Sequence, residues 1–393
     1  MFPRISDLIN YLLGTHLNIP IQSYGFMMAV AFVAGGFIIF SELKRKEKEG
    51  ILRPRVRKVL KGGPPSFQEV FFSGLFGFLL GWKGIGMLLE YSFFSRHPQD
   101  FILSGKGSLI GGLLLGGGFA FFAYYSKKRR QLKEPVTEEV TIHPYEITGN
   151  ILLIAAIFGI IGSKVFDIME HFGDVLRDPV GTLISFSGLS FYGGLIFAAF
   201  AVGWYAYRNG IRFPDIADVV APGLILAYAI GRIGCQLAGD GCWGIPNLSP
   251  KPHWMGFLPD WVWAFNFPHN VIDSGNLIPG CGGDHCYILT QPVYPTSLYE
   301  TLMGVVIFAV LWSIRKQLRI PGYLFCVYLI LNGTERFLIE LIRVNQLYNV
   351  LGLSLTQAQI IAIVLILLGA TGFFFFRWLN RRYLRTRETP SKP

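Results

Sequence analysis

Nine apolar segments, each close to the length that crosses a bilayer, restrict this chain to a membrane fold. A helix needs about 20 predominantly apolar residues to span the hydrocarbon core. Only 15% of the residues are charged, against about 25% in soluble domains. The pattern predicts an all-α polytopic membrane protein with about nine transmembrane helices. The segments cover residues 20–41, 69–93, 107–126, 147–169, 188–207, 216–238, 296–314, 321–342 and 355–376.

The Lys and Arg residues are distributed unevenly between the connecting loops. With the N-terminus outside, 25 of the 35 lie in the inner loops and the C-terminal tail, six lie outside and four lie within apolar segments. Because cytoplasmic loops carry the excess of Lys and Arg, we expect the N-terminus outside and the C-terminus in the cytoplasm. The net charge of +10 then belongs to the cytoplasmic face and its anionic lipid. No nucleic-acid partner is expected.

The long outer loop is rich in proline, glycine and aromatic residues, which favours an ordered cap at headgroup level. Its Cys281 and Cys286 lie on the oxidising side. They form a disulfide with each other, or one of them pairs with Cys242. With His285 they match no strong zinc-ligand spacing, and no metal is expected. The predicted divisions are 1–19 (outer segment), 20–238 (six helices), 239–295 (cap), 296–376 (three helices) and 377–393 (basic tail).

The second and third apolar segments resemble the fourth and fifth. Phe78-Leu-Leu-Gly-Trp-Lys83 parallels Gly159-Ile-Ile-Gly-Ser-Lys164, and Leu109–Leu114 parallels Phe191–Ile196 at a similar offset. A duplicated helix pair would preserve the orientation of everything after it. Chance similarity between glycine-rich apolar runs is the alternative. On the first interpretation, an extra pair over 69–126 repeats 147–207.

Four basic residues lie inside apolar segments, where a fixed charge costs about 2.5–3.5 kcal/mol at a helix centre. All four fall toward the outer half of the bilayer, as do Tyr24 and Tyr192 at the starts of segments one and five. Either these groups share a polar chamber, or each charge snorkels to the outer headgroups. The four residues are Lys83, Lys164, Arg232 and Arg336.

The stretch around Arg232 reads GRIGCQLAGDGCWG. Arg232, Gln236 and Asp240 recur every four residues, so one helical face would present all three. The glycines leave the neighbouring helix surface without side chains, which permits close helix packing or close approach of a ligand. A guanidinium fork suits a phosphate. A structural Arg–Asp pair is the alternative.

The eighth segment carries Arg336, Glu340 and Arg343 on one face, at spacings of four and three. Arg336 and Glu340 form a purely structural pair, or the extra basic group leaves room for an anion. The seventh segment begins with Tyr299 and Glu300 near the outer surface, where they orient a ligand or belong to the helix cap. The residues alone indicate an outer-leaflet site for a phospholipid or other anionic amphiphile. They do not distinguish transport, binding and transfer chemistry.

These motifs resemble those of the bacterial prolipoprotein diacylglyceryl transferases. Gly231-Arg232-Ile233-Gly234, followed by an acidic residue and Trp243-Gly244, resembles the family signature GRxGNFxNxExxG. The resemblance covers most of residues 20–380. Further matches occur in the family's order at Tyr24-Gly25, Leu189–Leu195, Asp218–Pro222, Pro295–Glu300 and Arg336–Arg343.

The resemblance implies a multi-pass enzyme of the bacterial inner membrane, with the cap in the periplasm. It would move the diacylglyceryl group of phosphatidylglycerol to the lipobox cysteine thiol of a preprolipoprotein signal peptide, form a thioether and release glycerol 1-phosphate. No cofactor is implied. The catalytic residues would be Arg232, Arg336, Asp240, Glu340 and Tyr192. The substrate-binding residues would be Arg232, Tyr24, Gln236, Tyr299 and Arg343.

Several positions depart from the family pattern. Cys235 and Ala238 stand where the signature has Asn, Asp240 where it has Glu, and Tyr192 where the family has a histidine. The family usually has seven spans. Tyrosine, with a reference pKa of about 10, is a poor base for a thiol, so Asp240, Glu340 or the positive chamber itself would assist its deprotonation. We expect Cys235 to be a small packing residue. A non-catalytic phospholipid-binding or lipid-translocating protein of the same fold is the alternative.

Overall fold

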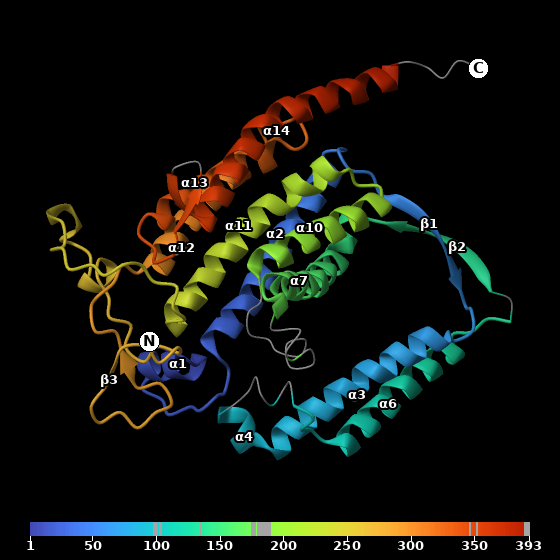
Figure 1. The fold of residues 1–393 in the computed structure, drawn as a ribbon. Coiled ribbons are helices and arrows are strands. Elements are labelled where there is room, and N and C mark those ends of the chain that lie inside the picture. The colour runs from blue at the N-terminus through green and yellow to red at the C-terminus, as the bar shows by residue number, and fades with distance from the viewer. Residues whose placement is uncertain are drawn as a thin grey trace.

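The computed structural model describes residues 1–96, 101, 104–133, 135–173, 178, 190–345, 347–350 and 353–388. Most of them are helical (Figure 1). The α-helices are α1 (Ile5–Leu13), α2 (Ser23–Lys48), α3 (Phe67–Leu89), α4 (Tyr91–Arg96), α6 (Leu109–Arg129), α7 (Thr148–Glu170), α10 (Phe191–Arg208), α11 (Phe213–Ala238), α12 (Thr296–Ile314), α13 (Tyr323–Glu340) and α14 (Gln357–Glu388). Short 3₁₀ helices are η1 (Pro144–Ile147), η2 (His253–Met255) and η3 (Asp260–Val262).

Seven helical stretches among the described residues are long and apolar enough to cross a membrane. The fifth and eighth predicted spans correspond to α10 and α13, which form as helices but are not among the seven. In α13 three charged residues, Glu335, Arg336 and Glu340, interrupt the apolar sequence. The all-α membrane prediction is therefore confirmed, with seven helices of spanning length and composition among the described residues in place of the nine predicted. The seven stretches are Ser23–Lys48, Phe67–Leu89, Leu109–Arg129, Pro144–Glu170, Phe213–Ala238, Thr296–Ile314 and Gln357–Arg381.

Helix α11 lies at the centre of the main bundle, between α2 and α12 (Figure 1). Glycines allow the close approach to α2: a Cβ built on Gly35 would lie 3.3 Å from the Gly223 carbonyl oxygen. Small residues at such interfaces let helix backbones pack closely in lipid. Helices α13 and α14 pack together beside α12, and the Ile225, Ile307 and Leu311 side chains are buried where α11 meets α12. The bundle thus fixes α11, α12 and α13 relative to one another.

Two helical hairpins, α3–α6 and α7–α10, make corresponding internal contacts. A Cβ on Gly162 would lie 2.5 Å from the Gly193 carbonyl oxygen, and the matching Gly81 approaches the Gly111 carbonyl in the same way. The Ser190 amide donates to the Ser163 carbonyl at 3.2 Å. The matching amide in the other hairpin, that of Ser108, donates to Trp82 at 2.8 Å. The aligned positions of the two sequence pairs therefore occupy equivalent places in the two hairpins.

The α3–α6 hairpin is set apart from the main bundle and is joined to it by a two-stranded ribbon (Figure 1). Strands β1 (Arg55–Lys61) and β2 (Val136–Ile142) pair antiparallel, with Arg55 opposite Ile142. Opposite charges face each other across the ribbon, since Lys61 Nζ lies 2.8 Å from Glu138 Oε2. Three such two-stranded sheets were not anticipated by the all-α prediction. The other two are β3 (Asn276–Leu277) with β4 (Tyr287–Ile288) and β5 (Leu347–Val350) with β6 (Leu353–Thr356).

The segment between α11 and α12 is ordered, as its composition predicts. Cys281 and Cys286 form a disulfide, and Cys242 is free. Phe267, Leu289 and Val293 form a small buried cluster. At the centre of this segment the Asn270 amide is fully buried and donates to three backbone carbonyls. The segment lies at the same end of the molecule as α1, opposite the β1–β2 ribbon (Figure 1).

Candidate functional site

One buried carboxylate, that of Glu300 in α12, contacts three arginines. Arg232 Nε of α11 lies 3.2 Å from its Oε2. On the other oxygen, Oε1, Arg336 NH1 lies at 3.1 Å and Arg343 NH1 at 3.3 Å. The Glu300 side chain is fully buried, whereas the arginine side chains are 13–21% exposed. A buried carboxylate is thus compensated from three positions that the sequence separates by up to 111 residues.

A second carboxylate supports Arg336 from its own helix. Glu340 Oε2 lies 3.4 Å from Arg336 NH2, and the Asn345 amide donates to the other Glu340 oxygen. The sequence-predicted spacing of four residues is realised here on α13. Glu340 is buried, so its charge depends on this pairing. The Arg336 guanidinium is held from two sides, by Glu300 and by Glu340.

Tyr228 of α11 contacts both Arg232 and a further buried carboxylate, that of Glu335. Its ring lies beneath Arg232, with the guanidinium carbon 5.1 Å from the ring centroid. Its hydroxyl donates to Glu335 Oε1 at 3.1 Å, and Glu335 is itself buried. Such a cation–π contact orients a guanidinium while leaving its edge donors unused. The plane of Arg232 is therefore fixed by a ring on one face and by a carboxylate at Nε.

The Arg232 terminal nitrogens are the feature that suits an anion. Guanidinium carries five N–H donors, and among the described residues the contact of Arg232 with Glu300 is an ion pair through Nε without a hydrogen bond. The three contacts to Glu300, at 3.1–3.3 Å, are longer than the 2.7–2.9 Å typical of strong charge-assisted bonds. The terminal N–H groups of Arg232 would donate to two phosphate oxygens in the bidentate way that arginine favours.

Of the four basic residues predicted to share a chamber, the structure brings Arg232 and Arg336 to one carboxylate and places Lys83 and Lys164 elsewhere. Lys83 Nζ donates to the carbonyls of Phe101, Ser104 and Lys106 at the end of the α3–α6 hairpin. Lys164 Nζ pairs with Asp167 Oδ2 at 2.8 Å on its own helix. Each lysine thus finds partners within its own hairpin. Neither hairpin brings its lysine to the Glu300 cluster.

Asp240 does not share a helical face with Arg232 and Gln236. Helix α11 ends at Ala238, and Gly239 takes a left-handed conformation with φ of 64°. The predicted recurrence of four residues therefore ends before Asp240. Its carboxylate instead accepts the Cys242 amide at 3.1 Å. Glu300 holds Arg232 in the place that the sequence assigned to Asp240.

The predicted binding residues Gln236 and Tyr299 both make contacts that join elements. Gln236 Oε1 accepts the Ser297 hydroxyl at 2.5 Å and ties α11 to the first turn of α12. The Tyr299 hydroxyl donates to the Val262 carbonyl at 2.8 Å and ties α12 to the cap segment. These bonds set the position of the turn that precedes Glu300.

The two predicted tyrosines lie at the edges of the cluster. Tyr192, at the start of α10, interacts electrostatically with Arg336. Tyr24 begins α2 against the thin face of α11: a Cβ on Gly234 would lie 3.3 Å from Tyr24 Cα. Leu189, which opens the Tyr192 motif, lies outside the described residues. Tyr24 therefore borders α11, and Tyr192 is close enough to Arg336 of α13 to interact with it.

Sequence reasoning did not select Glu300, Glu335 or Tyr228 for the site. For Glu300, near the start of the seventh segment, the sequence left open whether it orients a ligand or belongs to the helix cap. The available signal was its position: it lies on α12 four residues after Thr296, inside an apolar helix, where an acidic residue needs a partner. Its partners come from other helices, and no local spacing identifies them.

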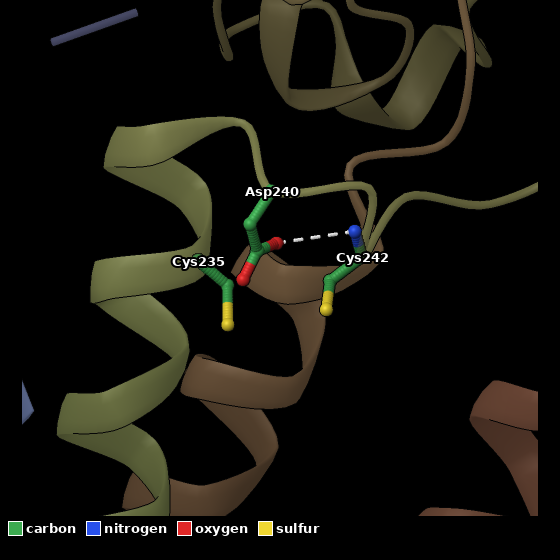
Figure 2. A group of neighbouring side chains, drawn as sticks. All are labelled: Cys235, Asp240 and Cys242. Atoms are coloured by element: carbon green, nitrogen blue, oxygen red, sulfur yellow. Dashed lines mark hydrogen bonds between the residues drawn. The ribbon is translucent and has the colours of Figure 1, made fainter. Parts of the chain in front are cut away.

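Two thiols and a carboxylate come together at the end of α11, with Cys235 in its last turn and the other two in the turn that follows (Figure 2). The Cys235 and Cys242 sulfurs and an Asp240 carboxylate oxygen all lie within 4.8 Å of one another. The Thr296 hydroxyl donates to the Cys242 carbonyl at 2.7 Å, so this group adjoins the first turn of α12. Cys235 is buried, in agreement with the predicted packing role, but it packs against a second thiol.

Comparison with known proteins gives a consistent result. A family model described as prolipoprotein diacylglyceryl transferase matches residues 111–375. This range contains the four members of the Glu300 cluster and begins within α6, so Tyr24 lies outside it.

Three relatives each carry the name phosphatidylglycerol–prolipoprotein diacylglyceryl transferase. The protein from Corynebacterium diphtheriae is 30% identical over 223 residues, 56% of this chain and 74% of the relative. The protein from Dehalococcoides mccartyi is 29% identical over 243 residues, 59% of this chain and 78% of the relative. The protein from Vibrio parahaemolyticus is 33% identical over 224 residues, 56% of this chain and 70% of the relative.

Proposed function

The chain belongs to the prolipoprotein diacylglyceryl transferase family, and from that premise we propose that it modifies lipoprotein precursors. It transfers the diacylglyceryl group of phosphatidylglycerol to the lipobox cysteine thiol of a preprolipoprotein signal peptide. A thioether forms and glycerol 1-phosphate leaves. The observation that carries the proposal is the cluster of Arg232, Arg336 and Arg343 around the buried Glu300.

The reaction places developing negative charge where these arginines can bind it. The thiol loses its proton, and its sulfur forms a bond to the terminal glyceryl carbon of the lipid. The bond from that carbon to the phosphate oxygen breaks, and its electron pair stays on the phosphate. Fixed donors aimed at such charge are worth more in a site shielded from water than in solvent. Arg232 and Arg336 bind the phosphate, with Arg343 beside them.

The remaining predicted residues take supporting roles. Glu340 orients Arg336, as their 3.4 Å contact supports, and Glu300 orients Arg232. Tyr192 and Tyr24 border the headgroup site, while Gln236 and Tyr299 hold the first turn of α12 in position. Asp240 lies next to two thiols, and its role belongs to the acceptor side of the reaction.

The topology follows from the same assignment. All nine long helices cross the bacterial inner membrane, α10 and α13 included, with the N-terminus in the periplasm and the C-terminus in the cytoplasm. The arrangement in Figure 1 supports this, because the basic β1–β2 ribbon and the N-terminal segment lie at opposite ends of the bundle. The segment 239–295 is then the periplasmic cap. Hairpin α3–α6 is a duplicate of α7–α10, as their corresponding glycine contacts support.

The test uses purified full-length protein in phosphatidylglycerol vesicles with a lipobox peptide. We expect release of glycerol phosphate and a matching gain in peptide mass. Arg232→Ala should lower the rate by about 100–1,000-fold, the loss typical when one charge-stabilising donor is removed. Arg232→Lys should recover little, since lysine lacks the fork. Arg208→Ala, at the far end of α10, is the matched control.

Two outcomes would contradict the proposal. If Arg232→Ala kept full activity, the phosphate role of that residue would be wrong. If the wild type formed no product where a relative does, the transferase assignment would fail. The same vesicles then measure the alternative, a non-catalytic phospholipid-binding or lipid-translocating protein, through binding or movement of labelled phosphatidylglycerol.

A further inference from the structure

We propose that Cys235, Asp240 and Cys242 form a zinc site whose fourth position takes the thiol of the acceptor peptide. The identity of the fourth ligand rests on the proposed function, whereas metal binding itself does not. The sequence predicted no metal: a zinc site was considered only at Cys281, Cys286 and His285, and Cys235 was expected to be a packing residue. The structure brings together two sulfurs and one carboxylate, a donor set that zinc accepts.

The geometry is close to that of a three-ligand site. Zinc bonds of about 2.0–2.3 Å in a tetrahedron place the ligand atoms roughly 3.3–3.8 Å apart. The three candidate atoms lie within 4.8 Å of one another. Rotations that move each atom by about an ångström would close the site around an ion. Figure 2 shows both thiols and the carboxylate directed into the same space between the end of α11 and the turn that follows.

The backbone sets these donors in place without relying on the ligand. Gly239 and Gly241 both have positive φ, 64° and 90°, a conformation that residues with a Cβ rarely adopt. They turn the chain back so that Cys242 returns to Cys235 on the last turn of α11. Asp240 is fixed by accepting the Cys242 amide. A preformed arrangement lowers the ordering cost of binding.

Charge and donor type favour zinc over harder cations. Thiolates select soft or borderline metals, whereas magnesium and calcium prefer oxygen-only sites. With two thiolates and one carboxylate, a bound Zn²⁺ would leave one net negative charge. Arg232 and Arg343 both interact electrostatically with Cys242, so they compensate that charge. Cys235 is 7% exposed, while Asp240 and Cys242 are more accessible, which leaves a route for a fourth ligand.

The transfer reaction needs a deprotonated acceptor thiol in addition to the arginines that bind the phosphate, and the zinc site would supply it. A thiol bound to zinc is deprotonated outright, so the acceptor sulfur would not depend on a strong base. Its proton passes to solvent, its sulfur then bonds to the glyceryl carbon, and the carbon–oxygen bond breaks toward the phosphate. Cys235 follows Arg232 by three residues on α11, a spacing that places the two on neighbouring positions of one face. Acceptor and phosphate would therefore meet at the end of this helix.

Metal binding is tested on the full-length protein, purified in detergent with reductant and without chelator. We expect one equivalent of zinc by elemental analysis. Cobalt(II) should bind in its place, with the near-ultraviolet absorbance of thiolate-to-cobalt charge transfer. Cys235→Ser and Cys242→Ser should lose the equivalent and the absorbance. Cys326→Ser, a free buried cysteine of α13 outside this group, should keep both.

The fourth position is tested by adding the lipobox peptide to the cobalt-loaded protein. The charge-transfer absorbance should rise by about half as a third thiolate joins two, and a peptide with serine for the lipobox cysteine should leave it unchanged. Absence of stoichiometric metal, or a disulfide between Cys235 and Cys242 in protein purified without reductant, would overturn the site. Metal binding without a response to peptide would overturn the fourth ligand alone. Metal binding without transfer activity would count against the proposed function, not against the site.

Discussion

The Glu300 carboxylate contacts three guanidinium groups that would otherwise repel one another. At full burial, a carboxylate without partners is costly, and so are arginines in a membrane interior. Their mutual compensation explains how all four groups reside between α11, α12 and α13. It also leaves the arginines, rather than the glutamate, on the partly exposed side. The position of the three arginines therefore depends on Glu300, whose own side chain is fully buried.

Glu300→Gln should damage both stability and activity. The substitution keeps the shape but removes the charge that all three arginines share. Removal of one partner from a buried ion pair typically costs about 3–5 kcal/mol. A displacement of the arginines by about 1 Å would lower the rate roughly 100-fold. Thermal unfolding in detergent and the peptide-transfer assay measure the two effects.

The matched control is Asp284→Asn, which removes an exposed carboxylate that pairs with Arg4. Surface pairs contribute about 0–1 kcal/mol, so this variant should resemble the wild type. If Glu300→Gln behaved like the control, the compensating role of Glu300 would be wrong.

At the scale of elements, glycines determine how closely the hairpin helices approach. In α7, Gly162 meets the backbone of Gly193 and the Phe197 side chain in α10. Among the described residues, a Cβ built on Gly159, one turn earlier, would meet no heavy atom of another helix within 4 Å. Gly162 and Gly159 are the same residue type on the same helix, but within the described part of the chain only a Cβ added at Gly162 would meet α10. They therefore form a matched pair for testing what close packing of α10 contributes.

Gly162→Ala should destabilise the protein, whereas Gly159→Ala should not. The new methyl group would lie 2.5 Å from both the Gly193 oxygen and the Phe197 Cβ. Overpacking of this kind costs about 1–3 kcal/mol. Because α10 carries Tyr192, the transfer rate should fall as well. Unfolding temperature and rate are measured for both variants, and equal behaviour would show that the contact does not position α10.

At the scale of the whole molecule, the α3–α6 hairpin is a separate unit. Its helices pack mainly on each other, and the ribbon of β1 and β2 connects it to the bundle (Figure 1). Its outer end touches the N-terminal segment through a hydrogen bond from the Tyr91 hydroxyl to the Asn18 carbonyl, at 2.9 Å. The ion pairs of the Glu300 cluster involve no side chain from the described part of this hairpin. The hairpin is therefore an addition to a bundle that forms the cluster without it.

Removal of residues 56–141 should leave a folded, active transferase. Arg55 and Ile142 lie opposite each other in the ribbon, so two glycines can join them without displacing α2 or α7. We expect the shortened chain to purify as a monodisperse protein in detergent and to modify the lipobox peptide. The full chain is the reference in both measurements. A folded but inactive product would show that the hairpin takes part in substrate handling.

The sequence by itself determined the helices and their order, and it selected four basic residues, of which the structure brings Arg232 and Arg336 to one carboxylate. Apolar length identified the seven described helices that could cross a membrane, because a segment in lipid must satisfy its backbone internally. The cost of a buried charge identified Arg232 and Arg336. The five-residue separation of Cys281 and Cys286 was consistent with their local disulfide. Each of these conclusions depends on properties within one segment.

Only the tertiary structure decided which groups meet. Glu300 joins Arg232, Arg336 and Arg343 because glycine contacts and buried side chains fix the rotation of α11 against its neighbours. Periodicity reports the face of one helix and contains nothing about that rotation. The end of α11 at Ala238 likewise removed Asp240 from the predicted face and placed it beside two thiols. Contacts between helices depend on packing, and packing is settled only when the whole bundle forms.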